Sequence, residues 1–346
     1  MSDIDIRVSG RAGRITLNRP KALNALTYDM AMAIEAALDN WRGADIDLIV
    51  IDAMGDKAFC AGGDIEDLYN AGKSGDYAFG QTFWRDEYRM NHKMARFPKP
   101  VVALMQGFTM GGGVGVGCHG SHRIVGDSSQ IAMPECGIGL IPDVGGSLLL
   151  ARAPGRLGEY LGLTTARMGA GDAIHCGFAD YYIPEEGWPA LIARLEETGD
   201  MAEVDRAAAP APQAPLAAHQ AEIDAHFAGE KLGDIYRGLP DAPSEFMAKA
   251  VKAMSRVSPL SAACTVEILH RVRAADDIAY ALEQEYRFTY RALEHGDFVE
   301  GIRAAIIDKD RAPNWKYTTW EDVPPAQVLA MTTPLGDARL RLEEQE

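Results

Sequence analysis

The feature that most constrains this chain is a glycine-rich stretch that runs from Phe108 to Gly146. The apolar run VVALM at 101–105 predicts a buried strand leading into it, and residues 114–119 predict a helix. Gly111–Gly113 fall at the turn between them, where the missing side chains let backbone amides approach a ligand closely. Those amides are expected at the positive N-terminus of the helix, which favours a negatively charged group.

Two isolated carboxylates follow in the same stretch, Glu135 in MPE and Asp143 in IPDVGG. Amide donors together with nearby carboxylates suit a reaction that builds an oxyanion on a carbonyl group. Each carboxylate also has a purely structural interpretation. Asp143 would serve as the N-cap of a helix beginning near Val144, and Glu135 would be a surface turn residue after proline.

A second glycine turn, KAFCAGGD at 57–64, follows a short buried strand predicted at 48–51. Asp64 is expected to cap a helix that runs through Tyr69. Glycine therefore opens a helix directly after a strand at two places in the chain. The two turns could supply two convergent amides.

A long helix is predicted over residues 77–97, with an apolar stripe that includes Phe83 and Met90. Glu87 lies four residues after Phe83 and therefore on the same stripe. A carboxylate on a buried helix face is either paired with a cation or functional. Arg85 lies only two positions away and points elsewhere, so it cannot be the partner of Glu87 within the helix.

The composition excludes several classes of protein. With 346 residues, 47% of them hydrophobic, the chain is expected to form one large domain and a smaller one. A net charge of −16 argues against nucleic acid or an anionic membrane as the main partner. Five cysteines without CxxC spacing look like free thiols of a reducing compartment. No secretion signal and no apolar run of ~20 residues is apparent, so we expect a soluble cytoplasmic protein.

The pattern of elements changes along the chain. Strands and helices alternate over residues 1–205, which predicts a largely parallel α/β core. Residues 206–220 contain the run AAAPAPQAPLAAH and are expected to form a linker or an exposed loop. Residues 221–346 have a helical pattern, with one helix expected to begin at Asp276 and to end at Gly296.

Other catalytic patterns are absent or misplaced. A GxGxxG spelling at Gly115, Gly117 and Gly120 would indicate a dinucleotide-binding turn, but the preceding strand ends near Met105, too early for such a turn. No Ser lies in GxSxG and no GxxxxGK[ST] occurs, so neither a triad hydrolase nor a P-loop enzyme is expected. The histidines show no paired spacing typical of metal ligands, so we expect no metal site.

Three motifs taken together resemble the crotonase (enoyl-CoA hydratase/isomerase) superfamily: AFCAGGDI, TMGGGVG and AMPECGIGLIPDVGG, in that order. Two further segments, SPLSAACTVEIL and DFVEGIRAAIIDKDRAPNW, resemble the hydrolase subfamily that acts on 3-hydroxyisobutyryl-CoA. These segments extend the resemblance across nearly the whole chain. The resemblance implies an α/β fold, a crotonase-like spiral of ββα turns with a helical C-terminal region.

The resemblance also implies roles for individual residues. The amides of Gly63 and Gly112 would form the oxyanion hole for the thioester oxygen, and Glu135 matches a carboxylate common to the hydratases and the hydrolase. Gly115 stands where the hydratases carry a second glutamate, whereas Asp143 stands where they carry a small residue. The candidate catalytic residues are therefore Glu135, Asp143, Gly63 and Gly112, and the candidate substrate-binding residues are Glu87, Gly62, Gly111 and Asp64.

These assignments imply hydrolysis of a short 3-hydroxyacyl-CoA, with 3-hydroxyisobutyryl-CoA cleaved to 3-hydroxyisobutyrate and CoA in valine catabolism. Glu135 would attack the carbonyl or activate water, and Asp143 would accept a hydrogen bond from the substrate hydroxyl. An enoyl-CoA hydratase or isomerase is the nearer alternative, and a non-catalytic acyl-CoA-binding relative is the farther one. Coenzyme A enters as part of the substrate, so no separate cofactor is expected. The resemblance allows a homo-oligomer.

Overall fold

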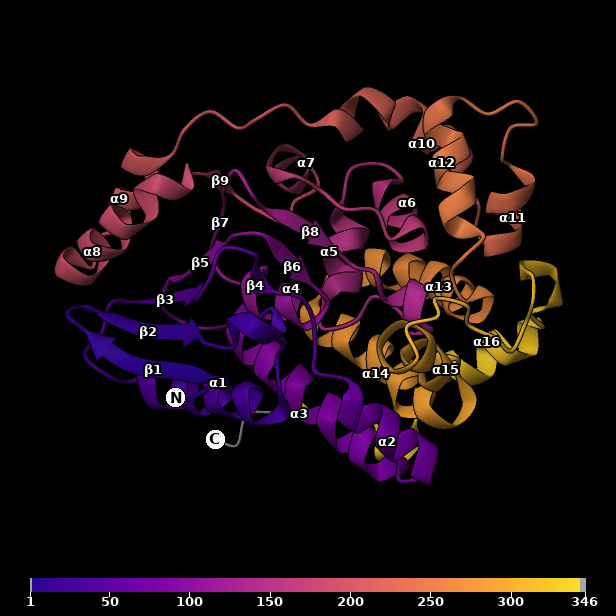
Figure 1. Ribbon diagram of the computed structural model, residues 1–346, viewed down its shortest axis with the longest axis horizontal. Helices are drawn as coiled ribbons and strands as arrows, with labels where there is room; N and C mark the ends of the chain where they lie inside the picture. The colour runs from indigo at the N-terminus through magenta and orange to yellow at the C-terminus, as the bar shows by residue number, and fades with distance from the viewer. Residues whose placement is uncertain (1, 343–346) are drawn as a thin grey trace. The chain divides into compact units, whose positions relative to one another are not determined.

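The computed structural model describes residues 2–342, and Figure 1 shows the order of their helices and strands. The chain forms two compact units. The first, here called the sheet unit, comprises Met1–Asp64, Arg89–Ala132 and Arg167–Ala218. The second, the helical unit, comprises Ile65–Tyr88, Met133–Ala166 and His219–Glu346. Each unit combines segments that are distant in the sequence. The division of the chain into domains at 1–205, 206–220 and 221–346 stays a prediction.

The sheet unit contains two sheets, whose strands are drawn as arrows in Figure 1. The strands are β1 (Ile4–Ser9), β2 (Ala12–Leu17), β3 (Leu48–Ala53), β4 (Ala58–Cys60), β5 (Val101–Met105), β6 (Phe108–Met110), β7 (His122–Val125), β8 (Gln130–Ala132) and β9 (Tyr181–Tyr182). One sheet has the order β1-β2-β3-β5-β7-β9 and the other the order β4-β6-β8. Strands β1 and β2 pair antiparallel, and the other neighbours in both sheets pair in parallel, as the sequence predicts.

The central strands are covered on both faces. In β3, Leu48 and Val50 alternate with Ile49 and Ile51, and all four side chains are fully buried. Burial on both faces is typical of a parallel sheet, whose crossover connections cover each side. Each fully buried side chain of this size contributes about 1.5–3 kcal/mol relative to an exposed one. Leu48 and Val50 belong to a core that also contains Leu195 of α8 (Trp188–Thr198).

The remaining helices of the sheet unit lie between its strands or follow the last strand, β9. They are η1 (Pro20–Ala22), α1 (Tyr28–Trp41), α4 (Gly112–Gly117), α7 (Ala170–His175), η3 (Glu185–Gly187) and α9 (Ala202–Ala207). Helix α1 begins where the sequence predicts, because the Thr27 side chain accepts a hydrogen bond from the Met30 amide at 3.2 Å. Residues 206–220 include the end of α9 and the short helix η4 (Pro215–His219).

The helical unit is made mainly of helices, which Figure 1 draws in purple, in magenta and in orange to yellow. They are α2 (Glu66–Ser74), η2 (Glu135–Ile138), α5 (Gly146–Arg152), α6 (Leu157–Thr164), α10 (Gln220–His226), α11 (Leu232–Arg237), α12 (Glu245–Met254), α13 (Pro259–Ala275), α14 (Ile278–His295), α15 (Phe298–Ile302), the π-helix η5 (Arg303–Ile307), η6 (Trp320–Asp322), α16 (Pro325–Thr332) and η7 (Gly336–Ala338). Helix α3 (Tyr77–Ala95) contributes residues 77–88 to this unit and 89–95 to the sheet unit.

Two predicted helix starts are wrong. Asp64 does not cap a helix: α2 begins at Glu66, and its N-cap is Ile65, which makes no side-chain capping bond. Asp276 does not begin the next long helix either, because it adopts a left-handed conformation (φ +50°) as the C-cap of α13. The neighbouring Asp277 caps α14 instead, accepting a hydrogen bond from the Tyr280 amide at 2.9 Å.

Candidate functional site

The two glycine turns lie next to each other in the sheet unit. They follow β4 and β6, which pair in parallel, so both turns lie at the carboxyl ends of the strands of the three-stranded sheet. A Cβ atom added to Gly113 would lie 2.1 Å from the Cys60 carbonyl oxygen. A Cβ atom added to Gly62 would lie 3.7 Å from the Met110 carbonyl oxygen. The turns therefore pack backbone against backbone, and Gly113 leaves no room for a side chain.

The conformations of both turns require glycine. The φ angle is +123° at Gly62 and +49° at Gly111, and other residues rarely adopt these values. Helix α4 begins at Gly112, two residues before the predicted start at 114. Gly112 consequently stands at the first position of the helix, closer to its positive end than the sequence pattern indicates.

The amides of Gly63 and Gly112 can donate to a ligand. The Leu26 amide donates to the Gly62 carbonyl oxygen at 2.9 Å, and the Asp64 amide donates to the Leu26 carbonyl oxygen at 2.8 Å. Within residues 2–342, the Gly63 amide between these bonds donates to no protein group. Gly112 is the first residue of α4, and the first amides of a helix have no acceptor inside it. Two such amides in neighbouring turns are what an oxyanion site requires.

Asp64 serves a different purpose from the one predicted for it as a cap. Its carboxylate accepts a hydrogen bond from the guanidinium of Arg19 at 3.0 Å, within the sheet unit. The Asp64 side chain is 38% exposed, so this ion pair is worth at most about 1 kcal/mol. The pair fixes the end of the first glycine turn near the loop that follows β2. A direct contact between Asp64 and a substrate stays a prediction.

Four buried carboxylates gather in the helical unit, and we call them the acid cluster: Glu87, Glu135, Asp143 and Glu285. They come from α3, η2, the turn before α5, and α14 respectively. Each is at most 4% exposed. No cation stabilises any of their charges in the part of the chain that the structure describes. Burial without a cation raises the pKa of a carboxyl group, because the charged form loses its hydration.

Asp143 is held by a tyrosine. The Tyr88 hydroxyl donates a hydrogen bond to Asp143 Oδ2 at 2.7 Å. Burial raises the pKa of Asp143 to about 7, although the hydrogen bond from Tyr88 acts in the opposite direction. The structural interpretation of Asp143 as a helix cap is wrong, since the N-cap of α5 is Gly145 and makes no side-chain capping bond. Asp143 is therefore a buried acid, oriented by a phenol.

Glu135 has one carboxylate oxygen that no protein group within residues 2–342 satisfies. It begins the short helix η2, and its Oε2 atom is buried without a hydrogen-bond partner. Burial, followed by the charge of Asp143, raises the pKa of Glu135 well above its ordinary value. The interpretation of Glu135 as a surface turn residue is wrong, because its side chain is only 4% exposed. A buried carboxylate oxygen without a donor is costly unless a ligand or a proton completes it.

Glu87 lies on the buried face of α3, as its helical spacing predicts. Burial, followed by the charge of Asp143, raises the pKa of Glu87 to about 8. Arg85 does not pair with Glu87, as expected from the helix geometry, and instead binds Asp86 at 2.9 Å. The structure thus brings the three predicted acids Glu87, Glu135 and Asp143 into one cluster.

Tyr88 and Glu285 are the members of this region that the sequence analysis missed. Tyr88 follows Glu87 directly in RDEY, but the contact with Asp143 joins residues far apart in the chain. Glu285 lies on a stripe of α14 whose buried members are spaced three or four residues apart, namely Ile278, Ala281, Leu282, Glu285, Phe288 and Thr289. A carboxylate on that stripe is the same signal that identified Glu87, so the helical spacing also indicates Glu285.

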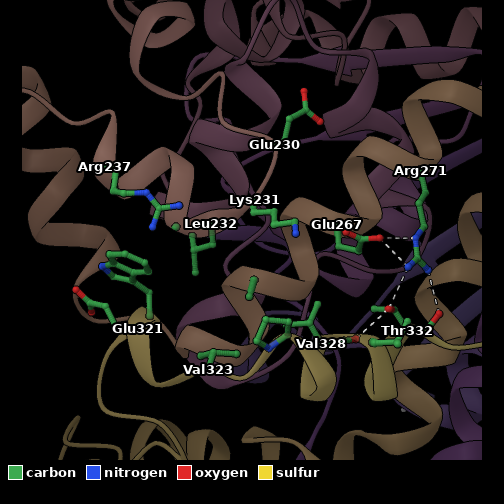
Figure 2. A pocket seen from close by; sticks show the side chains of 15 residues that line it. Glu230, Lys231, Leu232, Arg237, Glu267, Arg271, Glu321, Val323, Val328 and Thr332 are labelled. Atoms are coloured by element: carbon green, nitrogen blue, oxygen red, sulfur yellow. Dashed lines mark hydrogen bonds and ion pairs between the residues drawn. The ribbon is translucent and has the colours of Figure 1, made fainter.

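The helical unit also contains a cavity of about 390 Å³, whose lining differs from the acid cluster because it includes cations (Figure 2). Residues of α11, α13, η6 and α16 line it, and it includes acids and bases in similar number. Its acid Glu267 pairs with Arg271 at 2.7 Å, and Arg271 donates to the Thr332 carbonyl oxygen at 3.0 Å. No residue of the acid cluster lines it. The unpaired carboxylates, and not this cavity, therefore define the candidate site.

Among residues 2–342, no group of three or more His, Cys, Asp or Glu residues is arranged to hold a metal ion. None of the helices described is both long and apolar enough to cross a membrane. All five cysteines are buried free thiols, as their spacing predicts.

Comparison with known proteins identifies the relatives of this chain. A model of the enoyl-CoA hydratase/isomerase family matches residues 12–332. The 3-hydroxyisobutyryl-CoA hydrolase, mitochondrial, of Gallus gallus is 35% identical, with 99% of this chain and 91% of that protein covered. The protein of the same name from Rattus norvegicus is 38% identical, with 96% and 89% covered.

Solved structures of high similarity carry different names. A crystal structure described as an enoyl-CoA hydratase from Rhodobacter sphaeroides 2.4.1 has a TM-score of 0.94 and 57% identity, covering 98% of this chain and 100% of that one. A structure described as a carnitinyl-CoA dehydratase from Mycobacterium thermoresistibile has a TM-score of 0.95 and 38% identity, and both chains are fully covered. These likenesses confirm the predicted crotonase-like α/β fold with a helical C-terminal region.

The comparisons contradict one expectation. The curated relatives are named as mitochondrial proteins, so the predicted cytoplasmic location is wrong. The prediction rested on free cysteines and on the apparent lack of a secretion signal. Reduced thiols indicate a reducing compartment, and they do not distinguish the cytoplasm from the interior of a mitochondrion.

Proposed function

Because the chain belongs to the enoyl-CoA hydratase/isomerase family, we propose that it hydrolyses the thioester of a short 3-hydroxyacyl-CoA, with 3-hydroxyisobutyryl-CoA as the preferred substrate. The observation that carries the proposal is Glu135 Oε2, a buried carboxylate oxygen with no partner. The relatives named as hydrolases support the substrate class. Cleavage of this substrate would yield 3-hydroxyisobutyrate and CoA and would belong to valine degradation.

The glycine turns supply the electrophilic part of the reaction. The amides of Gly63 and Gly112 donate to the thioester oxygen, which becomes an oxyanion when the carbonyl carbon is attacked. A backbone donor aimed at a developing oxyanion stabilises the transition state by about 3–4 kcal/mol. Glycine holds these amides in place, because Gly62 has φ +123° and a Cβ atom at Gly113 would lie 2.1 Å from the Cys60 carbonyl oxygen.

Glu135 supplies the nucleophilic part. In one route its carboxylate adds to the carbonyl carbon, the C–S bond breaks, CoA leaves as a thiolate that gains a proton, and water then hydrolyses the resulting anhydride. In the other route Glu135 removes a proton from water, the hydroxide adds to the same carbon, the C–S bond breaks, and the CoA thiolate takes up the proton. A raised pKa makes the ionised Glu135 a stronger base and a stronger nucleophile in both routes. Label found in Glu135 after a single turnover in ¹⁸O-labelled water would identify the anhydride route, since only that route can place label there.

Asp143 and Glu87 bind the substrate in this proposal. Asp143 Oδ2 accepts from Tyr88, and the other oxygen, Oδ1, accepts the hydrogen bond of the 3-hydroxyl group. Glu87 is close enough to Asp143 for the Asp143 charge to raise its pKa, so it orients the same end of the acyl group. Coenzyme A arrives and leaves as part of the substrate, and the proposal needs no further cofactor.

Hydration of an enoyl-CoA is the second candidate function. The family description and the name of the 57% identical structure favour it. Hydration requires a group that delivers a proton to the substrate carbon, and Gly115 stands where the resemblance places the second glutamate of hydratases. Gly115 is buried inside α4 and has no side chain to transfer a proton.

The test is an assay of the purified protein on two substrates. With 3-hydroxyisobutyryl-CoA we expect release of free thiol, detected with a thiol reagent. With crotonyl-CoA we expect no loss of the enoyl absorbance. Loss of the enoyl absorbance without thiol release would establish the hydratase instead. Binding of both substrates without either reaction would establish a non-catalytic acyl-CoA-binding protein.

A further inference from the structure

Glu285 forms the most extensive set of hydrogen bonds within the acid cluster. It is fully buried in α14, and its Oε2 atom accepts a hydrogen bond from the Gly145 amide at 2.8 Å. Its Oε1 atom accepts from the Ser147 amide at 3.1 Å and also from the Ser147 hydroxyl. Three donors from one short segment therefore converge on a single carboxylate.

That segment is the turn that carries Asp143. Gly146 donates to the Asp143 carbonyl oxygen at 2.7 Å, which closes the turn. Val144 has φ +54°, a left-handed conformation that a β-branched residue adopts only under constraint, and Gly145 follows with φ +79°. A strained backbone persists where surrounding contacts fix it, and the bonds to Glu285 are such contacts.

We propose that Glu285 is a positioning residue for thioester hydrolysis: it holds the turn that carries Asp143 and adds a negative charge beside Glu135. This inference rests on the proposed function and extends it to a residue from the helical C-terminal region. Glu285 touches no substrate in this account. It acts through Asp143, whose carboxylate it helps to place, and through Glu135, whose ionisation it opposes.

The electrostatic part depends on the groups that face Glu285. Burial, then the charge of Asp143, and then the charge of Glu285 raise the pKa of Glu135. Burial, opposed by the hydrogen bonds from Ser147 and Gly145, raises the pKa of Glu285 to about 8. An ionised Glu285 therefore opposes the ionisation of Glu135.

Charged groups on the neighbouring helices are occupied elsewhere. Helix α14 packs against α2, α5, α13, α15 and α16, and α3 contacts it through Tyr88 and through Gln81, whose carbonyl oxygen accepts from the Tyr286 hydroxyl at 3.0 Å. The ion pairs on these helices include Arg152 with Asp276, Glu267 with Arg271, Glu159 with His270 and Arg273, Glu300 with Arg303, and Arg85 with Asp86. Helix α14 itself carries Glu283 with Arg287 and Glu294 with His295. The charged residues of α2, Glu66, Asp67 and Lys73, are exposed, and α16 has none. Tyr88 is the remaining titratable group that senses Glu285. The charge of Glu285 thus interacts with three titratable groups, those of Asp143, Glu135 and Tyr88.

The experiment compares Glu285→Gln, Glu285→Ala and the control Glu283→Gln, which changes a partly exposed acid on the same helix. Thiol release from 3-hydroxyisobutyryl-CoA is measured from pH 5 to 10. We expect Glu285→Ala to lower kcat/KM about 100-fold, as misplacement of a binding group does. Glu285→Gln keeps an acceptor for Gly145 and should regain at least about tenfold of that loss. Glu283→Gln should match the wild type.

The pH profile separates positioning from general structural support. With one charge fewer beside Glu135, Glu285→Gln should move the acid limb of kcat/KM about one unit toward lower pH. A profile that coincides with that of the wild type would overturn the electrostatic role. Activity of Glu285→Ala equal to that of the control would overturn the positioning role.

A second measurement keeps this inference separate from the proposed function. Amide hydrogen exchange at Gly145 and Ser147 should be faster in Glu285→Ala than in the control, whether or not the protein releases thiol. A wild type that releases no thiol would sink the proposed function. Unchanged exchange at those two amides would sink the turn-holding role by itself.

Discussion

Glu159 and the acid cluster are both buried carboxylates of the helical unit, but only Glu159 is surrounded by cations. Its side chain is fully buried and pairs with Arg156 at 2.8 Å, with Arg273 at 2.9 Å and with His270 at 3.2 Å. Burial acts to raise its pKa, but the hydrogen bonds from His270 and Arg273 outweigh it and lower the pKa to about 2. Among the described residues, no cation pairs with the four carboxylates of the acid cluster, and burial raises their pKa values.

The contrast indicates which buried acids are structural. A buried carboxylate that has cations and hydrogen bonds holds its neighbours together, and its charge is stable in the fold. A buried carboxylate without a cation destabilises the fold in its charged form, so its presence needs another reason. Perturbed pKa values of several grouped acids are typical of catalytic sites. We therefore interpret Glu159 as a structural acid and the acid cluster as a functional one.

The largest effect on stability is expected at Glu159. Glu159→Gln leaves Arg156, Arg273 and His270 without their shared anion, and should lower the free energy of unfolding at pH 7 by about 3 kcal/mol. Because the pKa of Glu159 is lowered, its contribution is present above pH 4.5 and fades as the pH falls toward 2. Chemical denaturation at pH 7 measures this change. A variant as stable as the wild type would break the comparison.

The next largest effect concerns substrate choice at Asp143. A site that binds a hydroxyl rejects the analogue without it, because its own polar group is left unpaired. Asp143→Ala should therefore lower kcat/KM for 3-hydroxyisobutyryl-CoA about 100-fold more than for isobutyryl-CoA. Parallel thiol-release assays on the two substrates measure the ratio. Equal losses on both substrates would mean that Asp143 takes part in the chemistry common to all thioesters.

The smallest effect is a gain of stability at Glu87. The pKa of Glu87 is raised from 4.5 to about 8, so its protonated form stabilises the fold below pH 4.5 and this stability is lost as the pH rises through 8. Glu87→Gln cannot lose that proton, and should be more stable than the wild type by about 2 kcal/mol at pH 8.5. Denaturation curves at pH 4.5 and 8.5 test this. A variant less stable than the wild type at pH 8.5 would show that the charged Glu87 has a partner.

Much of the fold could be predicted from the sequence, because its signals are local. The alternation of strands and helices, the cap at Thr27 and the glycine turns each depend on residues within a few positions of one another. Two predicted helix starts were wrong by one or two residues. The N-cap of α2 is Ile65 and not Asp64, and the N-cap of α14 is Asp277 because Asp276 ends α13. Capping is decided by backbone angles, which composition alone does not specify.

The site could be predicted only in part. Family resemblance located Glu87, Glu135 and Asp143, and helical spacing placed Glu87 on a buried face. The contacts of Asp143 with Tyr88, and of Ser147 with Glu285, join residues that are 55 and 138 positions apart. Such contacts depend on the tertiary packing of helices, and no local pattern encodes them. The paired state of Glu159 was hidden for the same reason.

The most direct test of the account compares Glu135→Gln with Glu159→Gln in thiol release and in unfolding. We expect Glu135→Gln to lose at least about 1000-fold in kcat on 3-hydroxyisobutyryl-CoA, because neither the nucleophilic nor the general-base route survives without the carboxylate. It should unfold at a denaturant concentration no lower than the wild type. Glu159→Gln should be less stable but retain its turnover when assayed below its unfolding transition. Near wild-type turnover by a folded Glu135→Gln, or loss of turnover by a folded Glu159→Gln, would contradict the assignment of the acid cluster as the catalytic site.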